Sequence, residues 1–478
     1  MRVLFAASEA HPFIKSGGLG DVMGALPKEL RNLDIDARVI IPRYKNIRQD
    51  FFNDMVYIRS FNVHVGWRNQ HCDVFEYTYD NVIYYFIGND YYFNRDEMYG
   101  HLDDGEKFAF FSRAILNFIG EHNWCPDIIH CNDWQTGMLP VMLRVEYLRN
   151  SFYSNIKTVY SIHNLLFQGN FSPSVLPELF GYDYTLYENM SLELNGAVSY
   201  MKGGINFSDK ISTVSRTYAE EIKTKEYGEN LEGLLVYRAN DLVGIVNGID
   251  YNEYNPAEDI HICKKYGIYN LHDKSENKRD LQYSLGLPIN HNVPVISIVS
   301  RLTNQKGIDL IINSIEQILE RGAQLVILGT GEERYENYFR YLQDKYRDKV
   351  SANITFDNAL AHRIYAGSDM FLMPSMFEPC GLGQLIALRY GTVPIVRETG
   401  GLKDTVIPYN KISGIGNGFS FREYKAEDLS LIMNYALDFY YNDKNAWNSI
   451  ISQAINSNNS WHKSANEYKN LYEEIIWG

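Results

Sequence analysis

Cations, carboxylates and glycines occur together at several points of this sequence, in patterns that suit the binding of a phosphorylated ligand. Lys15 precedes the pair Gly17-Gly18, and Arg301 and Lys306 occur five residues apart, just before a glycine. Paired glycines let the backbone come close to a ligand, and the free amides at a helix start favour an anion. Arginine adds a forked pair of donors, and lysine adds a mobile point charge. The chemistry these residues suggest is recognition of phosphate oxygens.

A second kind of chemistry is suggested by Glu378, which is followed by Gly381 and Leu382. A carboxylate accepts hydrogen bonds from hydroxyl groups, and exposed amides at the start of the next helix take an anion. This stretch therefore suits a ligand that carries a neutral hydroxylated group and a phosphate.

Polar residues also follow two apolar runs in the first half of the chain. One run ends in His130-Cys131-Asn132-Asp133, and the other ends in Ser161-Ile162-His163-Asn164. We take Asp133, His163 and Asn164 as candidates for a pocket on this side of the molecule.

Each of these stretches also has a plain structural explanation. Lys15 and its glycines suit a flexible turn with a surface lysine, and short glycine motifs are weak signals. Arg301 and Lys306 suit two solvated surface cations, and Glu378 suits a carboxylate that caps a helix. A histidine at a strand end is also more often structural than catalytic. Their position in the fold decides between these explanations.

The elements that must position these residues are short buried strands that alternate with helices. Strands are expected at residues 3–7, 37–41, 82–87, 127–130, 158–162, 210–214 and 242–246, and again at 295–299, 324–328, 353–356, 370–373 and 392–396. Helical periodicity is clearest at residues 106–120, and helices are also expected at 307–321, 382–390 and 461–477. Buried strands joined by helical crossovers indicate parallel sheets, and two such series indicate an α/β chain of two Rossmann-like domains with a cleft between them. In parallel α/β domains ligands gather at the carboxyl ends of strands, where the candidate residues fall.

The domain boundary is expected at the turn formed by Asn247 and Gly248, which we also take as a hinge. The first domain spans residues 1–247, the second spans 248–455, and residues 456–478 form a helix expected to pack back on the first domain.

Composition restricts the possible function. The chain has 478 residues, and its 45 lysines and arginines against 59 acidic residues give a net charge of −14, which argues against a nucleic-acid partner. No apolar run suits a signal peptide or a membrane span, and five scattered cysteines do not suit a disulfide framework, so we expect a soluble cytoplasmic protein. We find no metal-ligand motif and expect neither a metal nor a cofactor.

Taken together, these motifs resemble the bacterial glycogen synthases, which are similar to plant starch synthases. The likeness begins at Lys15-Ser16-Gly17-Gly18-Leu19, is most specific from Phe377 to Gly391, and continues to Thr399-Gly400-Gly401-Leu402. Two positions depart from the pattern: Ile386 stands where many related enzymes have a second glutamate, and Ser16 stands where many have threonine. We expect both changes to be tolerated.

The resemblance implies a GT-B fold and a retaining hexosyltransferase with ADP-glucose as donor and glycogen or another α-1,4-glucan as acceptor. It implies that Arg301 and Lys306 hold the diphosphate, that Glu378 binds glucose hydroxyls and that His163 positions the glucose. The other donor-binding residues that it implies are Lys15, Gly17, Gly18, Gly381, Leu382 and Phe356, the last as a ring that stacks on adenine. Asp133 and Asn164 would line the glucose or acceptor pocket.

Two alternatives remain open at this point. One is a GT-B glycosyltransferase with another donor or acceptor, and the other is a glucan-binding protein without catalytic activity. The four charged residues Lys15, Arg301, Lys306 and Glu378 are all present, which favours an enzyme. Since the sequence offers no obvious carboxylate nucleophile, we expect the acceptor to attack from the face on which the diphosphate leaves.

Overall fold

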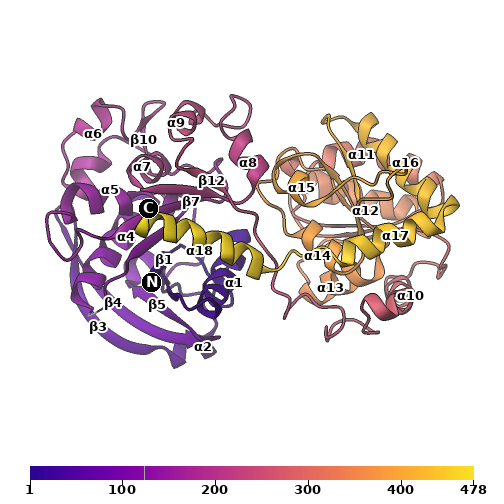
Figure 1. Ribbon diagram of the computed structural model, residues 1–478, viewed down its shortest axis with the longest axis horizontal. Helices are drawn as coiled ribbons and strands as arrows, with labels where there is room; N and C mark the ends of the chain where they lie inside the picture. Colours follow the sequence, from indigo (N-terminus) through magenta and orange to yellow (C-terminus); the bar gives the residue numbers. More distant parts are fainter. Residues whose placement is uncertain (123) are drawn as a thin grey trace. The chain divides into compact units, whose positions relative to one another are not determined.

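A sheet of mainly parallel strands forms the centre of each of two units in this computed structural model, which describes residues 1–122 and 124–478 (Figure 1). Unit 1 comprises Met1–Ile245 together with Trp461–Gly478, and unit 2 comprises Val246–Ser460. The chain therefore leaves unit 1 after Ile245 and returns to it at Trp461.

The main sheet of unit 1 has nine strands within the described residues. Their order across the sheet is β12 (Leu242–Gly244), β11 (Lys210–Thr213), β7 (Lys157–Ile162), β6 (Ile128–Asn132), β1 (Arg2–Ala6), β2 (Asp36–Pro42), β5 (Val82–Gly88), β4 (Arg68–Tyr79) and β3 (Val56–Val65). The strands from β12 to β5 run parallel, whereas β3, β4 and β5 form an antiparallel meander. The sequence analysis predicted the parallel strands and missed the hairpin of β3 and β4.

Helices and one small sheet complete unit 1. The helices are α1 (Gly18–Asn32), α2 (Gln49–Asp54), α3 (Asp90–Phe93), α4 (Asp104–Glu121), α5 (Met138–Met142), α6 (Thr185–Glu188), α7 (Tyr200–Phe207), α8 (Arg216–Glu221), α9 (Glu232–Tyr237) and α18 (Trp461–Trp477). Shorter helical segments are η1 (Trp134–Thr136), η2 (Leu143–Tyr147) and η3 (Leu176–Phe180), and the small sheet pairs β8 (Asn170–Phe171), β10 (Ala197–Ser199) and β9 (Glu193–Leu194).

The last helix, α18, is an integral part of unit 1. It packs against α1, and Figure 1 shows it in yellow across the indigo and purple strands. Its Tyr472 is fully buried and hydrogen-bonds through its hydroxyl to Nδ1 of His130 on β6, at 2.7 Å. Helix α18 thus contributes to the core of unit 1 beside β6, a strand more than 300 residues earlier in the sequence.

Unit 2 contains a six-stranded parallel sheet in the described residues. Its order is β15 (Val350–Asn353), β14 (Gln324–Leu328), β13 (Val295–Val299), β16 (Met370–Met373), β17 (Val393–Arg397) and β18 (Phe419–Phe421). Its helices are α10 (Lys274–Ser284), α11 (Ile308–Glu320), α12 (Glu333–Lys345), α13 (Asn358–Gly367), α14 (Gly383–Arg389), α15 (Gly400–Thr405), α16 (Ala426–Asn442) and α17 (Lys444–Ile455), with the short segments η4 (Ile268–Asp273) and η5 (Asn304–Lys306). Helix α11 shows why such helices form here, because its apolar residues recur at helical spacing and face the core while its polar residues remain outside.

One strand of unit 2 was predicted in the wrong place. The sequence analysis expected a strand at residues 353–356, but β15 ends at Asn353. Asp357 accepts a hydrogen bond from the N–H of Leu360 at 2.9 Å and so caps α13. This cap makes residues 354–357 the entry to a helix, and the apolar character of Ile354 and Phe356 misled the prediction.

Strand order defines the point in each unit where ligands are expected. In unit 2 the chain moves outward from β13 in one direction and then from β16 in the other, so the loops after these two adjacent strands diverge. In unit 1 the same reversal occurs between β1 and β6. The crevice at the carboxyl ends of such a pair is where open α/β sheets bind ligands.

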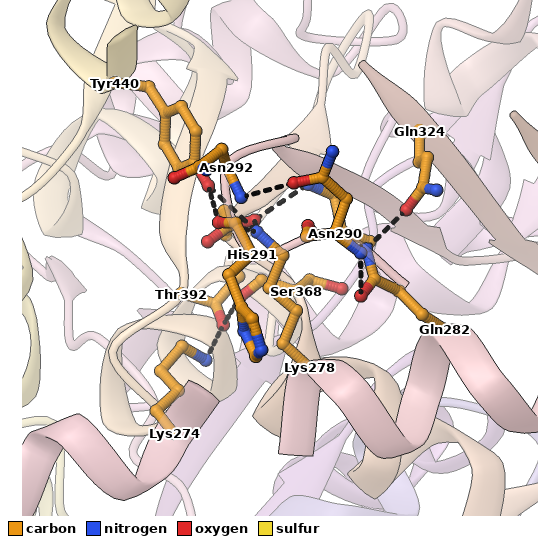
Figure 2. Close-up of polar contacts among 12 residues, drawn as sticks. Lys274, Lys278, Gln282, Asn290, His291, Asn292, Gln324, Ser368, Thr392 and Tyr440 are labelled. Carbon is orange, nitrogen blue, oxygen red and sulfur yellow. Dashed lines mark hydrogen bonds and ion pairs between the residues drawn. The ribbon is translucent and has the colours of Figure 1, made fainter. Parts of the chain in front are cut away.

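A buried polar cluster lies at the opposite end of the unit 2 sheet, where the strands begin. Figure 2 shows Lys274, Lys278 and Gln282 projecting from α10 into this cluster. Lys274 donates from Nζ to the carbonyl of Ala366 and to Oγ1 of Thr392, both at 2.8 Å. Lys278 pairs with Asp369 at 2.7 Å. These bonds join α10 to the end of α13 and to the start of β17.

Stability of unit 2 is expected to depend on pH through Lys274. Burial lowers the pKa of its amine to about 7, whereas a lysine in an unfolded chain titrates near 10.4. Between these values the unfolded chain binds more protons, so the free energy of unfolding rises with pH, by at most about 1.4 kcal/mol per pH unit. Urea unfolding at pH 7, 8 and 9 should show this rise in the wild type and a smaller one in Lys274→Met. Equal pH slopes for the two proteins would contradict the assignment.

None of the helices in residues 1–122 and 124–478 combines the length and the apolar character needed to span a membrane.

Candidate functional site

The edge of unit 2 where β13 and β16 end brings together Lys306 and Glu378. The Nζ atom of Lys306 lies 2.6 Å from Oε2 of Glu378, and both side chains are largely buried. Ser375 donates its hydroxyl to the same carboxylate oxygen at 3.0 Å. These two donors fix the orientation of Glu378 and leave its other oxygen, Oε1, as an acceptor. Glu378 is therefore a positioned carboxylate here, and it does not cap a helix with its side chain.

Arg301 lies in the same loop as Lys306 but is exposed. Within the described chain its guanidinium has no hydrogen-bonding or ion-pair partner. Its five N–H groups are thus available to a ligand at this edge.

Two backbone amides follow Glu378 in the same loop, those of Gly381 and Leu382. Leu382 precedes the first residue of α14, and Gly381 adopts a φ of +76°, which favours glycine. In the part of the chain that the structure describes, no acceptor is paired with the N–H of Gly381 or Leu382. Free amides at the start of a helix provide an anion site.

Three loops at this edge interlock through glycines. A Cβ on Gly307, which has a φ of +70°, would overlap the carbonyl oxygen of Pro374. A Cβ on Gly400 would overlap the carbonyl of Glu378, and one on Gly401 would overlap that of Cys380. The loops after β13, β16 and β17 therefore pack backbone to backbone, which fixes Lys306 and Glu378 relative to each other.

At the corresponding edge of unit 1, Lys15 and the glycines follow β1. Lys15 pairs with Asp21 on α1 at 2.7 Å, and both side chains are partly exposed. Gly17 and Gly18 are exposed, and a Cβ on either would meet no atom within 4 Å. Among the described residues nothing accepts a hydrogen bond from their N–H groups. The open space and free amides beside the start of a 15-residue helix suit an anionic group.

Glu9 is a residue of this edge that sequence reasoning missed. It is only 4% exposed, and its Oε2 accepts hydrogen bonds from both the N–H and the hydroxyl of Ser16. Burial raises the pKa of the Glu9 carboxyl. The only signal in the sequence is a charged residue three positions after the end of an apolar strand. Its carboxylate holds the loop that carries Lys15 and the glycines.

Asp133 and His163 lie together at the ends of β6 and β7. Asp133 has a φ of +55°, which is rare for a residue with a side chain, and its Oδ1 accepts from the N–H of His163 at 2.8 Å and of Asn164 at 3.4 Å. Burial raises the pKa of the Asp133 carboxyl to about 7. Strained backbone of this kind is concentrated at functional sites.

His163 is neutral at physiological pH, because burial lowers the pKa of its ring to about 4. A 2.9 Å hydrogen bond joins its Nε2 to Oδ1 of Asn132. The amide nitrogen of Asn132 donates to the carbonyls of Ala6 and His130, so its oxygen receives the proton from Nε2. This leaves Nδ1 of His163 as an acceptor.

The remaining sequence candidates are Phe356, Asn247 and Gly248, and the backbone of Asn247 hydrogen-bonds the thiol of Cys380 in the loop that carries Glu378. Phe356 follows β15 after a short loop and is 85% exposed, so its ring is open to stacking. Asn247 and Gly248 lie just after the boundary of the two units, and Asn247 is buried. The segment that enters unit 2 and the segment that leaves it are hydrogen-bonded to each other here, because the N–H of Ile249 donates to the carbonyl of Asn459 at 2.9 Å.

The space beside Gly17 and Gly18 allows a test. We expect Gly18→Ala to fold normally and to raise the KM for a phosphorylated donor at least about tenfold, because a Cβ would displace an anion from the free amides, and a hydrogen bond to a charged group is worth about 1.5–3 kcal/mol. Gly233→Ala is the matched control, since a Cβ there also meets nothing within 4 Å but lies on α9. The KM for the donor and the melting temperature are measured for both variants. Equal KM values for Gly18→Ala and Gly233→Ala would contradict a role for this loop.

Comparisons with known proteins agree with this arrangement. Residues 2–237 match the family model of the starch synthase catalytic domain, and residues 284–453 match that of glycosyl transferases group 1. The chain is 62% identical over 476 residues to a glycogen synthase of Clostridium perfringens, covering 100% of this chain and 98% of the relative. It is 60% identical over 478 residues to one of Clostridium botulinum, with both chains fully covered.

A solved structure supports the same comparison at the level of the fold. The catalytic domain of starch synthase IV from Arabidopsis thaliana, bound to ADP and acarbose, matches with a TM-score of 0.92 and 32% identity, over 99% of each chain.

Proposed function

This chain belongs to the glycogen synthase family, and its two halves are the two domains of a GT-B glycosyltransferase. We propose that it transfers glucose from ADP-glucose to the non-reducing end of an α-1,4-glucan with retention of the anomeric configuration. The observation that carries the proposal is the Glu378 carboxylate, held by Lys306 and Ser375 at the point of unit 2 where ligands are expected. A positioned carboxylate beside cations and free amides suits a sugar joined to a diphosphate.

We assign the donor mainly to unit 2. Arg301 and Lys306 contact the diphosphate, and the amides of Gly381 and Leu382 bind a phosphate oxygen. Oε1 of Glu378 accepts hydrogen bonds from the glucose hydroxyls. The exposed ring of Phe356 stacks on the adenine. The starch synthase IV structure contains ADP, which supports a nucleoside diphosphate as the leaving group.

The edge of unit 1 is assigned to the phosphates and to the sugars. Lys15 and the amides of Gly17 and Gly18 contact the diphosphate. Nδ1 of the neutral His163 accepts a hydrogen bond from the transferred glucose, and Asp133 and Asn164 line the glucose or acceptor pocket. Acarbose in the starch synthase IV structure supports a saccharide acceptor.

The reaction is proposed to proceed on the face from which the diphosphate leaves. The bond between the anomeric carbon and the phosphate oxygen breaks while the acceptor hydroxyl attacks that carbon. The proton of the hydroxyl passes to the departing phosphate oxygen. Negative charge grows on the diphosphate during this step, so the cations and amides stabilise the transition state more than the bound donor. We also propose that the protein acts in the cytoplasm without a metal or cofactor.

Nucleotide release with glycogen as acceptor tests the proposal. ADP-glucose and UDP-glucose are offered separately, and the product is checked for longer chains that an α-1,4-specific amylase degrades. We expect ADP release with chain extension. Release of UDP alone would mean a different donor, and silence with both donors from a folded protein would favour a non-catalytic glucan-binding protein.

A further inference from the structure

Gln384, in the first turn of α14, is polar and fully buried. Its Nε2 donates to the carbonyl of Cys380 at 3.0 Å and to the carbonyl of Gly381 at 2.9 Å. The same nitrogen lies 3.3 Å from Oγ1 of Thr405, the last residue of α15. One buried amide therefore holds the loop that carries Glu378 and joins this loop to α15.

The orientation of the Gln384 amide is fixed by its neighbours. The hydroxyl of Thr405 donates its own proton to the carbonyl of Gly401 at 2.6 Å, so its oxygen acts toward Gln384 as an acceptor. Oε1 of Gln384 is buried and has no hydrogen-bond partner in residues 1–122 and 124–478. Turning the amide over would bring Oε1 against three acceptors. A buried oxygen without a partner is unfavourable and calls for an explanation, which the amide nitrogen supplies.

The two carbonyls that Gln384 binds determine where two N–H groups point. The carbonyl of Cys380 shares its peptide unit with the N–H of Gly381, and the carbonyl of Gly381 shares its peptide unit with the N–H of Leu382. Both peptide bonds are trans, and in a planar trans peptide the C=O and the N–H point in opposite directions. Because Gln384 draws both carbonyls toward the core, both N–H groups must face away from it. These are the two amides that bind a phosphate oxygen of the donor in the proposed function.

Gly381 makes this arrangement possible. It has a φ of +76°, and a Cβ at this position would overlap Oε1 of Gln384. The Gln384 side chain thus lies directly against the backbone of the loop that it holds. A side chain at position 381 would push the amide away and release the two carbonyls.

We propose that Gln384 is a positioning residue, which turns the N–H groups of Gly381 and Leu382 toward the phosphate that is bonded to the transferred glucose. This phosphate is the one nearer to Glu378, because Glu378 binds the glucose hydroxyls and belongs to the same loop. Gln384 itself contacts neither the donor nor the acceptor. The inference rests on the proposed function and names the residue that orients its anion-binding amides.

Replacement of Gln384 by methionine tests this role in the full-length protein. Gln384→Met keeps the length of the side chain and removes both donors, so the two peptide units lose their anchor. We expect it to weaken the binding of ADP at least about tenfold, and to leave the binding of AMP, which lacks the phosphate next to the sugar, within about twofold of the wild type. The value of kcat should fall as well, because the amides stabilise the departing diphosphate. Calorimetric titration with ADP and with AMP measures the binding, and ADP release measures kcat.

Gln282→Met is the matched control. Gln282 is also fully buried in unit 2, and its Nε2 donates to the carbonyl of Asn290 at 3.2 Å and to Oε1 of Gln324 at 2.8 Å (Figure 2). It lies in the polar cluster where the strands begin, at the opposite end of the sheet. This variant should lose stability and bind ADP as the wild type does. Thr405→Val, which removes only the acceptor that orients the Gln384 amide, should weaken ADP binding about two- to threefold.

The outcomes separate this proposal from the proposed function. A wild type that transfers no glucose contradicts the proposed function. A wild type that transfers glucose, with the ratio of ADP affinity to AMP affinity unchanged in Gln384→Met, contradicts the role of Gln384 alone, and so does an equal loss of affinity for both nucleotides. If Gln384→Met fails to fold, Thr405→Val decides, and an ADP affinity equal to that of the wild type would then overturn the proposal.

Discussion

Replacement of Arg301 by alanine is expected to lower kcat for glucosyl transfer by about 100- to 1,000-fold, with an unchanged melting temperature. The guanidinium contacts the charge that develops on the departing diphosphate, and loss of one such donor costs about 2.7–4 kcal/mol in the barrier. Because the Arg301 side chain is exposed and its guanidinium has no partner within the described residues, its removal leaves no buried group unpaired. Steady-state kinetics and thermal unfolding measure the two quantities.

Lys306 provides the contrast to Arg301. Lys306→Ala should lose a similar factor in kcat, but it also leaves the buried carboxylate of Glu378 without its cation, which costs about 3–5 kcal/mol in stability. The double variant Lys306→Ala with Glu378→Gln should recover stability and remain inactive. Arg347→Ala, a change at an exposed arginine of the same unit, is the control. Near-normal turnover of Arg301→Ala would contradict the assignment of the diphosphate to this loop.

Gly307→Ala is expected to destabilise unit 2 by several kcal/mol and to abolish activity. A side chain at a φ of +70° costs about 1–2 kcal/mol, and its Cβ would also overlap the carbonyl of Pro374, so one of the two loops must move. Since Gly307 directly follows Lys306, the movement separates Lys306 from Glu378. Denaturant unfolding and kcat report the two effects.

Gly414→Ala is a control that separates backbone strain at a positive φ from the overlap of a new Cβ with a neighbouring loop. Gly414 has nearly the same φ, +69°, but a Cβ there meets nothing within 4 Å. This control should therefore lose only the strain energy of about 1–2 kcal/mol and keep its activity. Equal losses of stability in the two variants would show that the interlocked loops contribute nothing.

The alternation of strands and helices was readable from the sequence, and the strands at 295–299, 324–328 and 370–373 are confirmed to the residue. Buried parallel strands are short, apolar and bounded by turn residues, which makes them easy to recognise. The hairpin of β3 and β4 was missed because one of its faces is exposed and its polar residues, such as Arg59 and His71, interrupt the apolar pattern.

The candidate residues were chosen from the sequence one by one, and their roles stay predictions, but the contacts that they make were not predicted. Spacing places Lys306 and Glu378 at two strand ends, yet only strand order shows that these strands are neighbours. The roles of Glu9, Asn132 and Ser375 depend on side-chain hydrogen bonds, to Ser16 and Glu378 within one loop and to His163 in another, and single-sequence reasoning has no signal for such contacts. The end of β15 at Asn353 was also not predictable from apolar residues alone. Asp357, four residues later, caps α13, so the strand stops before the apolar residues that the prediction had included.

The return of α18 to unit 1 has a consequence for synthesis of the protein on the ribosome. The partners of α18 in unit 1, α1 and His130, are made early, while the helix that covers them is made last. At about 5–20 residues per second, synthesis of unit 2 takes roughly 10–40 seconds, during which the apolar face of α1 waits without its cover. Nascent chains stalled before Trp461 should therefore bind chaperones through unit 1 even after unit 2 has folded, and release of the last 18 residues should end that binding.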